Sequence, residues 1–106
     1  MTATLTEEEF SKHVNTTFHV KFPDGQIDLQ LDEVKGYRNK AVERQGMERF
    51  SVYFAGPSQP PLPQHVYLME HDQMGEFEIF LVPVSQSERG FRYEAVFNYF
   101  KENSEK

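Results

Sequence analysis

Residues 76–84, Glu-Phe-Glu-Ile-Phe-Leu-Val-Pro-Val, constrain the fold most, because apolar side chains occupy both faces of the strand expected there. The two apolar sets are Phe77, Ile79 and Leu81 on one face, and Phe80, Val82 and Val84 on the other. A strand that is apolar on both faces has to be covered on both. One face can serve the core, and the second needs a helix, a barrel wall or another subunit.

Length and composition indicate a single domain over residues 1–106 that is rich in β structure. A chain of 106 residues is long enough to bury a core of its own. Ten Phe and five Tyr, with no Trp, favour pleated surfaces on which aromatic rings pack well. The net charge of −6 argues against nucleic acid or an anionic membrane as a partner, because phosphate binding needs clustered Lys and Arg.

The sequence also gives an expectation about location. It contains no cysteine, which excludes disulfides, thiolate nucleophiles and Cys-ligated metals. Its first residues have neither the basic nor the apolar region of a signal peptide, and no run approaches the roughly 18 apolar residues of a membrane span. We therefore expect a cytoplasmic protein.

Two local signals predict a short helix over residues 7–13. Thr6 and Glu9 have the spacing of a capping box. Leu5 and Phe10 have the spacing of the hydrophobic staple that accompanies such a cap.

After this helix the hydrophobic period becomes two, which predicts strands joined by turns such as Pro23-Asp24-Gly25. The expected strands cover residues 17–22, 26–34, 50–54, 65–71, 76–84 and 91–99. Residues 35–48 lack strong periodicity and are interpreted as a long connection, and the charged tail 101–106 is expected to fray. The fold class is thus mainly β, a small antiparallel six-stranded barrel or sandwich with a short N-terminal α-helix.

Four of the six prolines fall between Gly56 and Gln64, so this segment is expected to be a surface loop. Its Pro-x-x-Pro spacings are typical of segments that SH3 or WW domains bind. The simpler interpretation is a loop that its prolines stiffen.

Several segments resemble a family of uncharacterised small bacterial β-domain proteins. They are Leu5-Thr6 with Phe10, Phe50 with Phe54-Ala55-Gly56-Pro57, Leu62-Pro63-Gln64, Glu78-Ile79-Phe80-Leu81-Val82-Pro83 and Tyr93-Glu94-Ala95-Val96-Phe97-Asn98. The resemblance implies a small β domain that stands alone, and genes near those of phage-tail-like assemblies. It implies no activity, and it favours an accessory role in a larger assembly.

The second apolar face is the leading candidate for a binding surface. Its expected residues are Tyr53, Phe80, Val82, Val84 and Phe100, with Val96 nearby. Three alternatives remain for what lies against this face. The first is the N-terminal helix, through Leu5, Phe10 and Val14, and the second is another copy of the chain or another protein. The third is that the face lines a barrel interior that takes a small apolar ligand. The first two predict a structural or protein-interaction module without catalysis.

A polar cluster supports the alternative function, a small-molecule-binding or enzymatic barrel. Its members are Glu70, His71, Glu78 and Glu94, from the last three expected strands. No catalytic residue is assigned, because the sequence has no nucleophile elbow. No metal site or cofactor is expected either, since His65 and His71 on one strand would lie roughly 20 Å apart.

Overall fold

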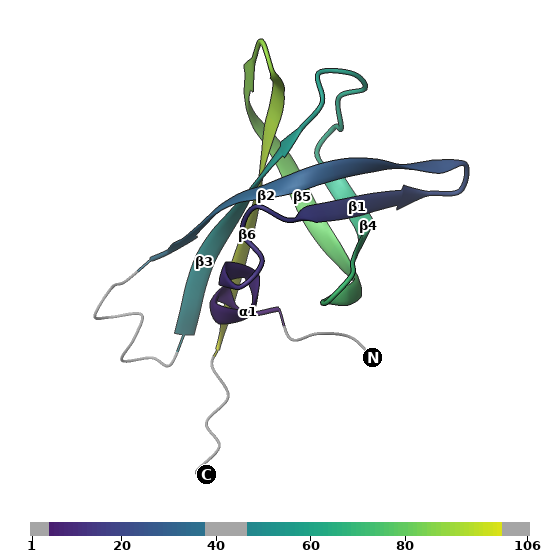
Figure 1. The fold of residues 1–106 in the computed structure, drawn as a ribbon. Helices are drawn as coiled ribbons and strands as arrows, with labels where there is room; N and C mark the ends of the chain where they lie inside the picture. Colours follow the sequence, from purple (N-terminus) through teal and green to yellow (C-terminus); the bar gives the residue numbers. More distant parts are fainter. Residues whose placement is uncertain (1–4, 38–46, 101–106) are drawn as a thin grey trace.

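The computed structural model describes residues 5–37 and 47–100, which form a closed antiparallel β-barrel with one short helix (Figure 1). The elements are α1 (Glu7–Ser11), β1 (Thr17–Phe22), β2 (Gly25–Gly36), β3 (Met47–Gly56), β4 (His65–His71), β5 (Gly75–Ser87) and β6 (Gly90–Phe100). Around the barrel the strand order is β1-β2-β3-β6-β5-β4. The predicted fold class is confirmed, and of its two versions the barrel is the one that forms.

The expected strand positions hold, but several strands are longer than the alternation indicated. β2 continues to Gly36 and β3 begins at Met47, within the stretch expected as a connection. Cross-strand pairing extends them, with Lys35 opposite Ser51 and Gly36 opposite Phe50. α1 is shorter than expected and ends at Ser11. The remainder of that connection, residues 38–46, and the tail 101–106 lie outside the described residues.

The core lies inside the barrel, where every strand contributes alternate side chains. Its strand residues are Phe18, Val20, Leu29, Leu31, Phe50, Val52, Phe54, Tyr67, Met69, Phe77, Ile79, Leu81, Tyr93 and Ala95. The inner set of β5, Phe77, Ile79 and Leu81, is therefore the face that serves the core.

Helix α1 closes one end of the barrel with a single phenylalanine. Thr6 Oγ1 accepts the Glu9 N–H at 3.0 Å, so the capping box fixes the start of the helix. Phe10 is fully buried, and its ring centroid lies 5.4 to 6.2 Å from those of four others, Phe18, Phe50, Phe77 and Phe97. Of the three possible covers of the Phe80 face, the helix is not the one that forms, because Phe10 packs inside the barrel and Phe80 stays 48% exposed. A staple specifies where a helix begins, and the interior offers Phe10 more apolar contact than the outside does.

The turn from α1 into β1 passes through Asn15, which has a φ of 72°. Asn tolerates this left-handed conformation better than most residues. Its N–H donates to the Leu31 carbonyl at 2.7 Å, and this bond ties the turn to β2.

The proline-rich loop covers the barrel end away from α1 (Figure 1). Leu62 is buried, and its N–H donates to the Tyr93 hydroxyl at 2.8 Å. The Tyr67 hydroxyl donates to the Pro63 carbonyl. These bonds hold the loop against the barrel, as expected of a stiffened loop.

Among the residues with described placement, no helix is long and apolar enough to cross a membrane.

Candidate interaction surface

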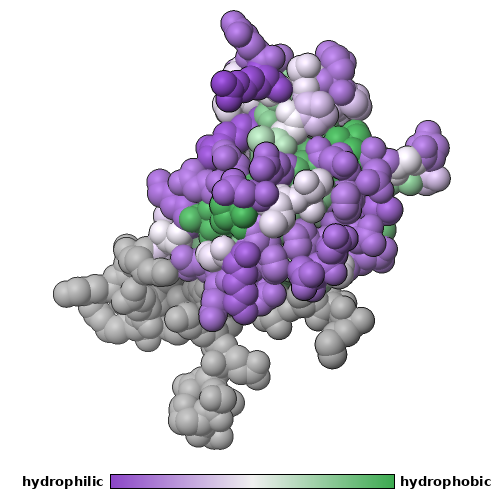
Figure 2. Space-filling model, viewed as in Figure 1, coloured by the Kyte–Doolittle hydropathy of each residue, from purple (hydrophilic) through white to green (hydrophobic). Residues whose placement is uncertain are grey.

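The outside of the barrel carries an apolar surface that the described residues leave partly exposed to solvent. We call it the outer apolar face, and it consists of Val66, Leu68, Phe80, Val82 and Val96. Phe80 is 48% exposed, and Val66, its direct cross-strand partner, is 49% exposed. Val96 of β6 is 58% exposed. Figure 2 shows that hydrophobic patches on the visible side of the molecule lie within a mostly hydrophilic surface.

The structure places only two of the five predicted binding residues, Phe80 and Val82, on the outer apolar face. Val84 is 44% exposed farther along β5. A register shift between Pro83 and Ser85 separates Val84 from the other two. Tyr53 lies on β3, and Glu94 stands between it and Val82 in the strand pairing. The side chain of Phe100 lies outside the described residues.

Acidic side chains border this face. Glu76 and Glu78 are exposed on β5, and Glu78 is opposite Leu68. Neither has an ion-pair partner among the residues that the structure describes. Glu70 of β4 does have one, the Lys21 ammonium at 3.4 Å. The surface beside Phe80 is thus apolar with uncompensated negative charge.

Glu94 belongs to a hydrogen-bonded group on the outside of β3 and β6. One of its carboxylate oxygens accepts from Ser51 at 2.7 Å and from Tyr53 at 3.1 Å. The Tyr37 hydroxyl lies 3.0 Å from Ser51 Oγ. Burial, together with the hydrogen bonds to Tyr37 and Glu94, raises the pKa of Tyr53 to about 12. No local sequence pattern indicates this group, because the β3–β6 pairing brings Glu94 to Ser51 and Tyr53, and Tyr37 joins them where it follows β2 and donates its N–H to the Arg49 carbonyl.

Arg92 fastens the same region to β2. Its guanidinium donates to Asp32 at 3.1 Å and to Glu33 at 2.8 Å, and it lies 4.3 Å from the centre of the Tyr53 ring. The bond to Glu33, followed by the one to Asp32, raises the pKa of Arg92 against the opposing effect of burial. With these partners, Glu94 links β6 to β3, and Arg92 links β6 to β2.

The four residues of the predicted polar cluster are not brought together. Glu70 and Glu78 point outward, whereas His71 points into the barrel and is only 4% exposed. Glu94 lies with Ser51 and Tyr53 on the other side of β5. In the described residues, no three His, Asp or Glu side chains form a group that could hold a metal ion.

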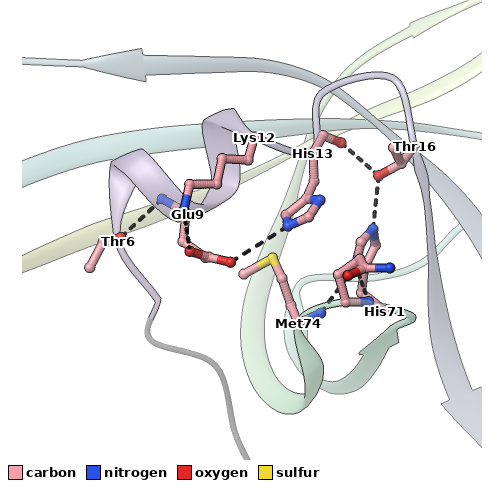
Figure 3. A network of polar contacts seen from close by, with 8 residues as sticks. Thr6, Glu9, Lys12, His13, Thr16, His71 and Met74 are labelled. Atoms are coloured by element: carbon pink, nitrogen blue, oxygen red, sulfur yellow. Dashed lines mark hydrogen bonds and ion pairs between the residues drawn. The ribbon is translucent and has the colours of Figure 1, made fainter.

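His71 has a structural role next to α1 (Figure 3). Its Nδ1 accepts the backbone N–H of Gln73 at 3.0 Å and that of Met74 at 3.3 Å. Nε2 therefore carries the proton and donates to Thr16 Oγ1 at 2.9 Å. Burial, and secondly the neighbouring His13 whose ring centroid is 4.6 Å away, lower the pKa of His71 and favour its neutral form.

A separate pocket of about 570 Å³ lies at the barrel end that the proline-rich loop covers. Its lining is mostly apolar: Phe22, Ile27, Pro60, Pro61, Leu62, Pro63, His65 and Tyr67. The volume falls in the range of small-molecule sites, about 300–1,000 Å³. None of the four residues of the predicted polar cluster lines it.

A comparison with known protein families identifies the family of this chain. The profile of the Domain of unknown function DUF6916 matches residues 5–97. The chain belongs to the DUF6916 family. The expected membership of a family of small β-domain proteins without an assigned function is therefore confirmed, and DUF6916 membership brings no activity with it. Searches of curated proteins and of solved structures found no match.

Proposed function

We propose that this DUF6916 protein is a non-catalytic protein-interaction module that binds a protein partner through its outer apolar face. The observation that carries the proposal is the exposure of Phe80, at 48%, on a strand whose other face already completes the core. Burying a side chain of this size fully is worth about 1.5–3 kcal/mol, so covering several half-exposed ones would stabilise a complex by several kcal/mol.

Charge favours a different protein over a second copy as the partner. The chain has a net charge of −6, and the face is bordered by Glu76 and Glu78. A twofold dimer through this face would bring the same acidic border of two copies together, which repels. A partner with basic residues beside an apolar centre fits better. A homodimer is the competing outcome of the test below.

We also propose the kind of assembly in which the protein takes part and its location in the cell. An accessory role in a larger, phage-tail-like assembly agrees with a small module that offers one apolar surface. A cytoplasmic location agrees with a sequence that has no cysteine.

Small-molecule binding is the second candidate function, and the pocket between the β1–β2 turn and the proline-rich loop favours it. Such a ligand would be apolar, because three prolines and the rings of Phe22 and Tyr67 supply most of the lining. This function would use other residues than the polar cluster expected from the sequence.

Photo-cross-linking at position 80 tests the interaction directly. A photoreactive amino acid in place of Phe80, in the producing cells, should give a discrete cross-linked product that contains a second protein. The same residue in place of Gln30, which is exposed on β2, is the matched control and should give none. A product of twice the mass of the chain would replace the partner with a homodimer. Equal labelling from both positions, or none from either, contradicts the proposal.

A further inference from the structure

On one side of the closed barrel two neighbouring strands, β5 and β6, pair along only part of their length, and we call the unpaired part the seam. β5 and β6 pair only from Val82 opposite Glu94 to Ser87 opposite Gly90. Before that point β5 pairs with β4 alone, from Gly75 to Leu81. After it β6 pairs with β3 alone, through to Phe100. Figure 1 shows the two strands diverging toward the end where α1 lies.

Each strand therefore has an edge along the seam that no other described strand pairs with. Unpaired N–H and C=O groups on such an edge are a template for another strand. Proteins that recognise peptides by strand addition use edges of this kind, with main-chain hydrogen bonds for affinity and alternate side chains for specificity.

The side chains around the seam determine what kind of added strand would fit there. On the outside, Phe80 and Val96 flank it and are 48% and 58% exposed. On the inside, the fully buried ring of Phe10 lies 6.0 Å from Phe77 and 5.4 Å from Phe97, ring centre to ring centre. An added strand would thus find apolar contacts for its outward side chains and little room for inward ones.

The positions of the acidic residues favour one of the two edges for binding an added strand. Glu76 and Glu78 are exposed on the β5 edge, whereas β6 beyond Glu94 carries no acid up to Asn98. Basic residues in the added strand would therefore be drawn to β5. A second copy that added its own β5 there would place the same glutamates against each other.

We infer that the partner binds by adding an extended segment to the β5 edge between Glu76 and Leu81. The segment has valine-like residues pointing outward beside Phe80, small residues pointing inward over Phe10, and Lys or Arg near Glu76 and Glu78. This inference rests on the proposed function and specifies how the partner engages the outer apolar face.

A peptide titration followed by amide NMR tests it. The probe is Val-Ser-Val-Ser-Lys-Ser-Lys, in which Val and Lys share the outward face and Ser the inward one, and we expect saturable shifts of the amides of residues 76–81 and 95–98. N-methylation of two backbone nitrogens that face β5 should weaken binding about tenfold or more, because each lost hydrogen bond is worth roughly 0.5–1.5 kcal/mol. Both registers of methylation are made, since only one of them faces β5.

A charge swap is the matched control. The double variant Glu76→Lys, Glu78→Lys should bind this peptide several-fold more weakly, and it should bind the version with both Lys replaced by Glu better than the wild type does. This reversal would support the placement of the basic residues. An unchanged preference would overturn it.

The experimental outcomes distinguish failure of this inference from failure of the proposed function. If methylated and unmethylated peptides bind equally and Phe80→Lys abolishes both, strand addition is overturned while the outer apolar face stays a binding surface. If no peptide binds at millimolar concentration, or the shifts fall at the pocket around Phe22 and Tyr67, strand addition is overturned. Cross-linking at position 80 then decides the proposed function on its own.

Discussion

Phe10→Ala is expected to lower the free energy of unfolding by about 3–5 kcal/mol, the cost of removing a buried phenylalanine ring and leaving a cavity. Phe10 is fully buried and its ring meets four others in the barrel, including Phe18 and Phe97. The loss would also free α1, whose only fully buried side chain is this one. Urea denaturation of the wild type and the variant measures the difference.

Phe80→Ala is the matched control for this prediction. It removes the same ring from the outside of the barrel, where Phe80 is 48% exposed and lies opposite Val66 in the strand pairing. A cross-strand pair of this kind is worth roughly 0.2–1 kcal/mol, so the control should lose about 1 kcal/mol or less. Equal losses for the two variants would contradict the position of α1 inside the barrel end.

His71→Leu is expected to destabilise the fold by about 2–3 kcal/mol, although leucine suits an apolar interior. The substitution leaves the N–H groups of Gln73 and Met74 without their acceptor and Thr16 without its donor. A buried donor without a partner costs about 1–3 kcal/mol. Thermal or urea unfolding at pH 8 measures the loss, and His65→Leu, an exposed histidine of the same strand, should change stability by about 0.5 kcal/mol or less.

The pH dependence of the His71→Leu difference gives a second readout. Burial makes the pKa of His71 lower in the folded chain than in the unfolded one. The unfolded chain therefore binds more protons as the pH falls below about 6.5, and the stability that neutral His71 contributes declines toward its folded pKa. The gap between wild type and variant should be full above about pH 6.5 and should narrow in acid. A gap that stays constant down to pH 4, or widens, would contradict the neutral hydrogen-bonded state of His71.

The alternation of apolar residues was enough to predict the strands and the fold class, because a strand's faces are set by local geometry alone. Closure into a barrel was harder to foresee, since it depends on β1 meeting β4 through only three residue pairs, His19 to Lys21. The residues that surround Phe10 could not be predicted from the sequence either. The capping box and staple describe contacts within the helix, whereas the surroundings of Phe10 come from four different strands.

For the candidate site, the sequence contained one signal that the polar-cluster hypothesis overlooked. Glu70 and His71 are consecutive on a strand, so they must point to opposite faces and cannot share a site. Pro83 was another signal, because a proline inside a strand marks a bulge or an edge. The register shift between Pro83 and Ser85 is where Val84 parts from Phe80 and Val82. The seam between β5 and β6 depends on which strands become neighbours and how far they pair, and no local pattern encodes that.

The central claim is that the outer apolar face is open to solvent in the isolated chain and is available to a partner. Paramagnetic relaxation by a soluble gadolinium chelate measures this directly. The account predicts that methyl signals of Val66, Leu68 and Val96 broaden strongly at all protein concentrations, while those of the buried Val20, Leu29 and Val52 do not. Protection of the first set equal to that of the second would show that the chain or a second copy already covers this face, and would contradict the account.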